Sequence, residues 1–158
     1  MKRTIRRRRL EAKTDYKSRI LLLKSGKNRL IIRRTNRYIV AQIVSSALAQ
    51  DKVITGATSK DLISKGWPEK NKGSLKNLQA AYLTGFLLGK KSKDKVKEVI
   101  LDMGMHRNIQ KSRLYSCLKG LADSGVKVNY SEKATPTLED LEKNKDFKEI
   151  FKKVKEGI

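Results

Sequence analysis

The chain has 158 residues and carries 38 Lys and Arg against 16 Asp and Glu, so its formal net charge is +22. Such a charge attracts nucleic acid or an anionic membrane surface, but no stretch approaches the roughly 20 apolar residues that cross a bilayer. The single cysteine, Cys117, excludes an internal disulfide and a cysteine-rich zinc site, and with no signal-peptide-like segment we expect a cytoplasmic protein.

Basic residues are concentrated near the N-terminus. The first 37 residues hold fifteen Lys and Arg against two acids, a local balance of +13. Residues 1–11 are interpreted as a basic arm around the uninterrupted run Arg6–Arg9, and its low apolar content predicts disorder until a partner neutralises the charge. A solvated, solubilising tail is the alternative, but four adjacent arginines favour an arm that binds RNA or DNA phosphates.

A helix is predicted directly after this arm. Tyr16, Ile20 and Leu23 recur at i, i+4 and i+7, which is the spacing of one helix face, and Ser25-Gly26 is typical of a helix end. The segment from Ile20 to Leu23 is also compatible with a strand. Lys13, Lys17 and Lys24 lie largely off this apolar stripe, with Arg19 at its flank.

Residues 29–44 predict a β-hairpin, around which the rest of the chain is organised. Two apolar runs, Leu30–Ile32 and Tyr38–Val44, are rich in β-branched residues and flank the polar cluster Arg33–Arg37. Asn36 tolerates the left-handed backbone of a tight turn. We expect one face of the hairpin in a core and three arginines at its tip, which suits a polyanion better than a catalytic cleft.

The central part of the chain predicts a third strand and a buried helix. Lys52–Thr58 has strand composition and would pair antiparallel to the hairpin, with Gly56 marking a bulge. In the polar stretch that follows, Trp67 is expected as a lid over a core edge rather than as a base-stacking platform. Ser74 is the expected N-cap of a helix to about Leu88, and Gly85 in its interior predicts close packing against a neighbour.

A strand, a helix and a second strand follow. Lys97–Met103 reads as a strand that Asp102 ends, Ser112 is expected to cap a strongly amphipathic helix, and Val126–Asn129 forms a short last strand. This spacing is typical of a parallel βαβ unit. The predicted fold class is therefore α/β, with a mixed sheet of antiparallel hairpin strands and a parallel βαβ unit, and residues 12–133 as its one domain.

Residues 134–158 are expected to form a C-terminal helical extension. They carry six acids and six bases, so this segment is neutral, unlike the rest of the chain. Phe147, Ile150, Phe151 and Val154 fall on one face of a short amphipathic helix. That apolar face would either fold back on its own domain or dock on a partner protein.

Few residues suit catalysis. His106 is the only histidine and lies in the loop after the Lys97–Met103 strand, where contact with backbone or phosphate is more typical than a catalytic role. Cys117 lies on an apolar helix stripe and is expected as an inert core thiol. Two-metal chemistry needs clustered carboxylates, and only Asp102 is well placed. We therefore expect no enzyme activity, metal, cofactor or small-molecule substrate.

The basic segments instead suit RNA, because Lys and Arg neutralise phosphates while short polar side chains reach 2′-hydroxyls and backbone oxygens. Composition alone does not distinguish RNA from DNA. The predicted RNA-binding residues are Arg3, Arg6, Arg7, Arg8, Arg9, Lys13, Lys17, Arg33, Arg34, Thr35, Asn36, Arg37, Tyr38, Gln42, His106, Arg107, Lys111 and Arg113.

Several stretches also resemble one known family. They are the hairpin Arg29–Ile43 and the segments Arg6–Tyr16, Ala81–Gly85, Val99–Arg107 and Lys119–Val126. Taken in order from about residue 4 to 133, they resemble the universal large-subunit ribosomal protein that binds 5S rRNA, the eighteenth large-subunit protein in bacterial naming, in its archaeal and eukaryotic-like form. The C-terminal helix is similar to that of archaeal members, although the segment before it is shorter here.

This resemblance implies a ribonuclease-H-like α/β fold without catalytic carboxylates, and a structural role in the large ribosomal subunit. The implied partners are 5S rRNA, large-subunit rRNA and a neighbouring 5S-binding ribosomal protein, in the central protuberance. The Arg33–Arg37 tip and the N-terminal arm carry over as principal RNA contacts, and the His106–Arg113 loop varies within the family. The alternatives are a ribonuclease-H-like nuclease, which needs three or four converging carboxylates, and a structural DNA-binding protein.

Overall fold

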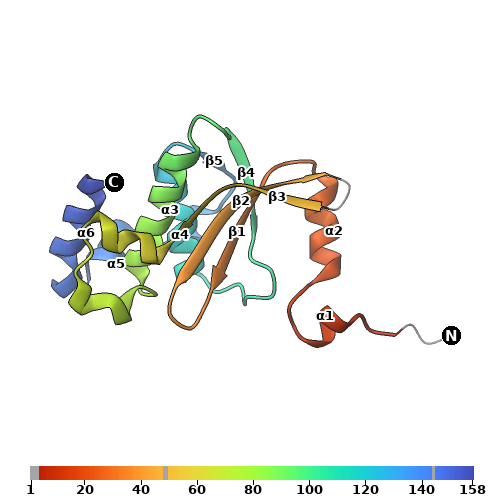
Figure 1. Cartoon of the computed structure of the whole chain (residues 1–158), viewed down its shortest axis with the longest axis horizontal. Helices are drawn as coiled ribbons and strands as arrows, with labels where there is room; N and C mark the ends of the chain where they lie inside the picture. The colour runs from red at the N-terminus through yellow and green to blue at the C-terminus, as the bar shows by residue number, and fades with distance from the viewer. Residues whose placement is uncertain (1–3, 48–49, 144) are drawn as a thin grey trace.

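One five-stranded sheet forms the centre of the computed structural model, which describes residues 4–47, 50–143 and 145–158 (Figure 1). The strands are β1 (Arg29–Arg34), β2 (Ile39–Ala47), β3 (Gln50–Thr58), β4 (Glu98–Asp102) and β5 (Lys127–Val128), in the order β3-β2-β1-β4-β5. The pairs β1–β2 and β2–β3 are antiparallel, whereas β4 runs parallel to both β1 and β5. The predicted mixed sheet, with a hairpin and a parallel βαβ unit, is confirmed.

The turn of the hairpin differs from the prediction. Positive φ angles outside glycine occur, among the described residues, only at Ala12 and Lys111, so Asn36 is not left-handed as expected. Instead the Thr35 amide donates to the Tyr38 carbonyl at 2.8 Å, and the Tyr38 amide donates to the Thr35 hydroxyl at 2.9 Å. The threonine side chain thus supplies the acceptor that closes the turn, and no left-handed residue is required.

The bulge between β2 and β3 lies two residues from its predicted position. Ile43 pairs with Thr55 but the next residue, Val44, pairs with Val53, so Ile54 is the extra residue. Gly56 keeps regular pairing with Gln42, whose Cγ would lie 3.4 Å from a Cβ added at this glycine. The glycine therefore makes room for a cross-strand side chain and does not mark the bulge.

Two helices, α3 (Leu78–Ser92) and α4 (Arg113–Asp123), pack on one face of the sheet and against each other. The predicted close contact at Gly85 is confirmed, because a Cβ there would overlap the carbonyl oxygen of Cys117. The N-cap of α3 lies three residues after the predicted position, Ser74. Asn77 is the N-cap, and its side chain accepts from the Ala80 amide at 2.7 Å, because Glu69–Ser74 forms a separate 3-10 turn, η2.

The C-terminal extension folds back on the domain. The short 3-10 turn η3 (Glu132–Ala134) leads into this extension, which contains α5 (Leu138–Glu142) and α6 (Lys145–Gly157). Phe151 and Val154 are buried in the common core, and Phe147 stacks on Trp67, which follows the 3-10 turn η1 (Ser59–Lys65), with 5.8 Å between ring centroids. Trp67 is thus the buried lid that was expected, and of the two predictions for the apolar stripe, packing on its own domain is the one observed.

The N-terminal helices lie at the opposite end of the molecule from α5 and α6 (Figure 1). Where a disordered arm was expected, Arg7–Leu10 forms one helical turn, α1, held by local hydrogen bonds such as that from Arg8 Nε to the Thr14 hydroxyl at 2.9 Å. The helix predicted directly after the arm is α2 (Tyr16–Lys24), which Asp15 caps. Its stripe is not buried as a whole, since Ile20 is 52% exposed. No helix of the described ranges is long and apolar enough to cross a membrane.

Candidate nucleic-acid interface

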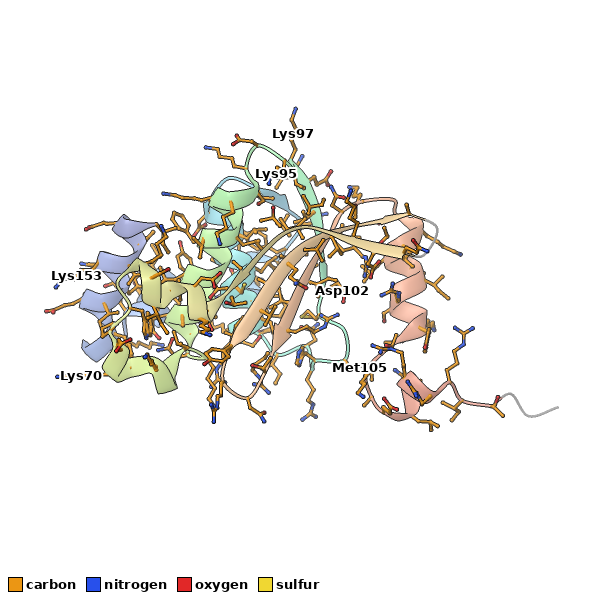
Figure 2. The ribbon with its side chains drawn as sticks, in the orientation of Figure 1. Lys70, Lys95, Lys97, Asp102, Met105 and Lys153 are labelled. Carbon is orange, nitrogen blue, oxygen red and sulfur yellow. The ribbon has the colours of Figure 1, made fainter. Side chains whose placement is uncertain are left out.

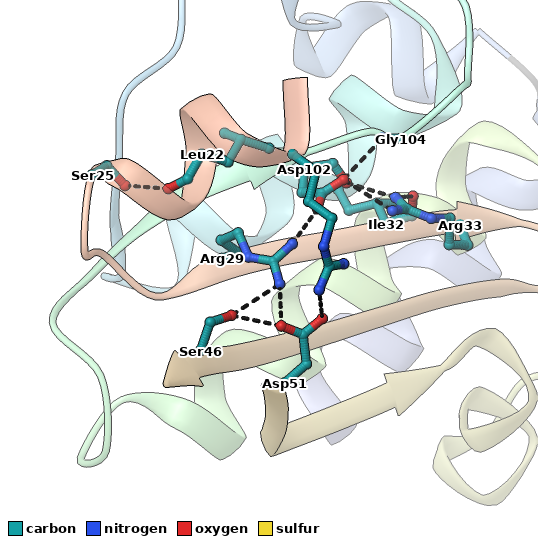
Figure 3. A network of polar contacts seen from close by, with 10 residues as sticks. Leu22, Ser25, Arg29, Ile32, Arg33, Ser46, Asp51, Asp102 and Gly104 are labelled. Atoms are coloured by element: carbon teal, nitrogen blue, oxygen red, sulfur yellow. Dashed lines mark hydrogen bonds and ion pairs between the residues drawn. The ribbon is translucent and has the colours of Figure 1, made fainter. Parts of the chain in front are cut away.

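A buried arginine organises the open face of the sheet, the face turned away from α3 and α4. Arg29 is 1% exposed, and its guanidinium lies between two carboxylates (Figure 3). Nη1 donates to Asp102 Oδ2 at 2.6 Å, and Nη2 donates to Asp51 Oδ1 at 2.6 Å. Burial alone would raise the pKa of Asp51, but hydrogen bonds from Ser46, Arg29 and Arg19 outweigh it and hold this pKa below its ordinary value.

The place of Arg29 in this buried network is not predicted from the sequence, in which Arg29 is only the first residue of the hairpin. The available signal was a basic residue at the start of an apolar strand, on the face opposite Leu30 and Ile32. Its partners come from separate strands, because Asp102 ends β4 and Asp51 lies in β3. A contact of this kind depends on strand order and register, which local composition does not reveal.

Arg33, predicted as an RNA contact, is held by the same network (Figure 3). Its Nη1 donates to the carbonyl oxygens of Asp102 and Ile32 at 2.7 and 2.9 Å, and Nη2 donates to Asp102 Oδ1 at 2.9 Å. The side chain is 38% exposed. Much of its hydrogen-bonding capacity is therefore used to tie β1 to the end of β4.

The tip of the hairpin carries two arginines that point outward without a protein partner. Arg34 and Arg37 are exposed, and neither side chain forms an ion pair or hydrogen bond with the described residues. Asn36 between them is exposed as well. Thr35 closes the turn, and Tyr38 is half-buried against the core. The turn thus presents two unneutralised guanidinium groups on a rigid strand pair.

The N-terminal arm lies near the loop that follows β4. Arg9 Nη1 is 3.2 Å from the sulfur of Met105 in that loop, and Arg6 lies over the Tyr16 ring at 4.6 Å. Arg7 and Lys13 both pair with Glu11, at 3.5 and 2.7 Å. Figure 2 shows Met105 and Asp102 on the side of the hairpin that faces the arm. Arg3 lies outside the described residues.

A groove separates the arm and α2 from β1 and β4, in the middle of the sheet. Its volume is about 430 Å³, and cations from three elements line it: Arg8 from α1, Arg19 from α2 and Arg33 from β1, with Lys13 from the connection between the helices. The chain thus brings together, along one side of the sheet, basic residues that are far apart in sequence. Lys17 is exposed outside this groove, and Gln42 lies half-buried in the middle of β2.

The loop after β4 brings together a further set of predicted residues. His106 Nε2 accepts a hydrogen bond from the Arg34 amide at 3.3 Å, and Arg107 and Arg113 line the same small pocket. Burial, together with the charges of Arg33 and Arg34, lowers the pKa of His106 below its ordinary value. Lys111 is directed elsewhere, since its ammonium pairs with Asp140 at 2.8 Å.

The acids of the open face are not arranged for metal-dependent chemistry. Asp102 accepts hydrogen bonds from Arg29, Arg33 and the Gly104 amide, so both carboxylate oxygens are occupied. Among the residues that the structure describes, no three His, Cys, Asp or Glu side chains come close enough to hold a metal ion. Cys117 is fully buried, which raises the pKa of its thiol to about 12.

The family model and the individual relatives that match this chain belong to the same family of ribosomal proteins. The model for "Ribosomal large subunit proteins 60S L5, and 50S L18" matches residues 2–99. The chain is 47% identical over 131 residues to large ribosomal subunit protein uL18 of Korarchaeum cryptofilum, covering 82% of this chain and 65% of the relative. The uL18 of Aeropyrum pernix is 43% identical over 132 residues, covering 82% of this chain and 60% of the relative.

A third relative, uL18 of Methanothermobacter thermautotrophicus, is 39% identical over 131 residues, covering 82% of this chain and 66% of the relative. The chain therefore spans 60 to 66% of the length of these three relatives. The identities extend over most of this chain, and the family model covers the hairpin and β4 up to Val99. The chain belongs to the family of ribosomal large-subunit proteins described as 60S L5 and 50S L18.

Proposed function

We propose that this protein is a structural constituent of the large ribosomal subunit that binds 5S rRNA. In the cytoplasm it would anchor that RNA to large-subunit rRNA in the central protuberance, together with a neighbouring 5S-binding ribosomal protein. The observation that carries this proposal is the hairpin tip, where the exposed side chains of Arg34 and Arg37 have no ion-pair or hydrogen-bond partner among the described residues. Membership in a family of large-subunit ribosomal proteins supports rRNA as the polyanion.

The proposed mechanism is charge neutralisation by a surface that is already folded. Arg29 and Arg33 tie β1 to the end of β4 through Asp102, so the hairpin is held at a fixed angle to the loop that follows β4. Arg34 and Arg37 would then meet phosphates without first being ordered, which lowers the entropic cost of binding. Arg33 acts in this account mainly as a positioning residue.

The N-terminal arm would add phosphate contacts along the groove that Arg8 and Lys13 line. Its side chains are held by weak, exposed contacts such as the 3.5 Å pair of Arg7 with Glu11, which RNA phosphates would replace at little cost. Each neutralised phosphate releases condensed counterions. With about 6–10 phosphate contacts, the affinity would fall by about a thousandfold or more between low and moderate salt.

The double variant R34E/R37E tests this proposal. It reverses two exposed charges without touching the buried network, so the protein should stay folded and lose at least about a hundredfold in affinity for 5S rRNA, or about 2.7 kcal/mol. The matched control is K70E/K153E, which makes the same charge change at exposed lysines at the far end of the molecule (Figure 2). Equal losses in the two variants would overturn the assignment of the hairpin tip.

A further inference from the structure

We propose that the loop after β4 and the start of α4 form a pocket for one phosphate group of the bound RNA backbone. The pocket has a volume of about 240 Å³ and draws on three elements. Arg34 comes from the hairpin, His106 and Arg107 come from the loop, and Ser112 and Arg113 mark the start of α4. This inference rests on the proposed function, because it names the group of the RNA that this part of the surface would take.

The pocket gathers positive charge that the described residues do not neutralise. None of Arg34, Arg107 and Arg113 forms an ion pair with a carboxylate of the described chain, and no acid lines the pocket. Three guanidinium groups around one small hollow repel one another unless an anion lies between them. Guanidinium groups also match the geometry of phosphate oxygens, which they bind through paired N–H donors.

The start of α4 adds donors that lack an acceptor. Ser112 is the N-cap, yet its side chain makes no capping hydrogen bond to the first turn of this 11-residue helix. Its hydroxyl oxygen is buried and has no hydrogen-bond partner among the described residues. The backbone N–H groups of a first helical turn attract anions through their partial positive charge. An anion in the pocket would therefore supply the acceptor that the Ser112 side chain does not.

The backbone before α4 is held in a conformation that costs energy. Lys111 has φ +53°, in the left-handed region that non-glycine residues seldom adopt. Its amide donates to the Ala134 carbonyl at 2.8 Å and its ammonium pairs with Asp140 at 2.8 Å, so contacts with the C-terminal extension fix this residue. Such strain is common where a site must be pre-organised. Here the strained residue directly precedes Ser112, at the start of the helix that lines the pocket.

The size of the pocket points to a phosphate rather than to a base or a whole nucleotide. Sites for small molecules usually have volumes of about 300–1,000 Å³, whereas this pocket has about 240 Å³. Its cationic lining also lacks the carboxylates that would accept from the amino group of a base. A backbone phosphodiester is small, carries negative charge and presents two free oxygens, so it suits a small pocket with a cationic lining.

The first test uses the RNA-free protein and inorganic phosphate, so that its outcome does not depend on 5S rRNA recognition. Titration should shift the amide NMR signals of Ser112, Arg113 and Leu114 in a saturable way. R113Q should weaken this binding by about tenfold, as expected for the loss of a charge-assisted hydrogen bond. The control K153Q removes an exposed cation far from the pocket and outside the proposed RNA-binding surface, and should leave phosphate binding unchanged.

Two results would overturn the proposal: phosphate shifts that do not saturate, or equal weakening by R113Q and K153Q, which would indicate diffuse attraction. If 5S rRNA binding fails while phosphate still saturates the pocket, the proposed function falls and the anion site stands.

A second experiment identifies the source of the phosphate. It compares the affinity of the protein for 5S rRNA with and without its 5′-terminal phosphate. Equal affinities for the two RNAs support the backbone assignment. Replacing internal phosphates one at a time with neutral methylphosphonates should then identify one position at which the R113Q variant and the unmodified protein bind with the same affinity. A loss confined to the RNA without its terminal phosphate would overturn it.

Discussion

The Arg29 guanidinium and the Asp102 carboxylate form a buried ion pair, with 2.6 Å between Nη1 and Oδ2. The side chains are 1% and 8% exposed. Arg29 begins β1 and Asp102 ends β4, and Asp102 also holds Arg33. One carboxylate thus joins the base of the hairpin, its far end and the loop that carries His106. The orientation of the proposed RNA-binding surface depends on this contact.

The D102N variant should lose stability because, among the described residues, it leaves the buried Arg29 charge with Asp51 as its one carboxylate partner. Removing one member of a buried pair costs about 3–5 kcal/mol, and the remaining partner places the expected loss near the lower value, about 3 kcal/mol. Urea denaturation measures it. The control D94N changes an exposed aspartate and should lose almost nothing. If the two variants unfold at the same urea concentration, the pair does not stabilise the fold.

Gly85 should not tolerate a methyl group, because α3 and α4 touch backbone to backbone at this residue. In G85A the new Cβ would overlap the Cys117 carbonyl, so the helices must move apart, and overpacking of this kind costs about 1–3 kcal/mol. Thermal unfolding followed by circular dichroism measures the change. The control is G73A, where nothing lies within 4 Å of the added atom. A G85A protein as stable as G73A would contradict the close approach.

The pKa of His106 should lie below 6.5, its ordinary value, because burial and the charges of Arg33 and Arg34 disfavour the imidazolium. At pH values between the folded pKa and 6.5, the unfolded chain binds more protons at His106 than the folded protein does. The free energy of unfolding therefore rises with pH in this window. The stabilisation is present above the unfolded pKa and is lost as the pH falls towards the folded one. NMR titration of the one imidazole in the chain measures the folded value directly.

The contradicting result for His106 is a folded pKa at or above 6.5, which would mean that the arginine charges do not reach the ring. The control variant H106Q carries no titrating group at this position. Its free energy of unfolding should therefore lack the rise with pH that the unmodified protein shows just below 6.5.

The C-terminal helix should contribute to the stability of the isolated protein. Phe151 is 4% exposed and its ring centroid lies 5.4 Å from that of Tyr82 in α3. F151A should therefore cost about 3–5 kcal/mol, measured by urea denaturation with the fluorescence of Trp67 as the probe. L138A removes a 55% exposed side chain from the same extension and serves as the control. If F151A behaves like L138A, the helix is not docked on its own domain in solution.

The elements with strong local patterns were predictable from the sequence. β-Branched runs on either side of Arg33–Arg37 indicated the hairpin, and the apolar spacing after Ser112 indicated α4. Both signals depend only on residues that lie close together in the sequence. The beginning of α3 was missed since Ser74 and Asn77 are both good caps, and the 3-10 turn that separates them has no clear sequence signal. The non-enzymatic class was also predicted correctly, since the family is one of structural ribosomal proteins.

The candidate site was predictable only in its composition. Arg33 and Arg34 are neighbours of the same residue type, yet Arg33 binds Asp102 and Arg34 lines the pocket beside His106, because successive side chains of a strand point to opposite sides. Lys111 was grouped with Arg107 but pairs with Asp140 of α5. In each case the partner comes from a distant part of the chain. Local composition identified the basic segments, while strand register decided which of their charges stay unpaired.

The central claim, specific binding of 5S rRNA, is tested most directly by a filter-binding titration with tRNA and duplex DNA as competitors, at two salt concentrations. The account predicts that 5S rRNA binds at least about a hundredfold more tightly than either competitor at moderate salt, or about 2.7 kcal/mol, with a steep loss of affinity as salt rises. Equal competition by all three would contradict it and indicate a general affinity for polyanions. A preference for duplex DNA would instead favour a structural DNA-binding protein.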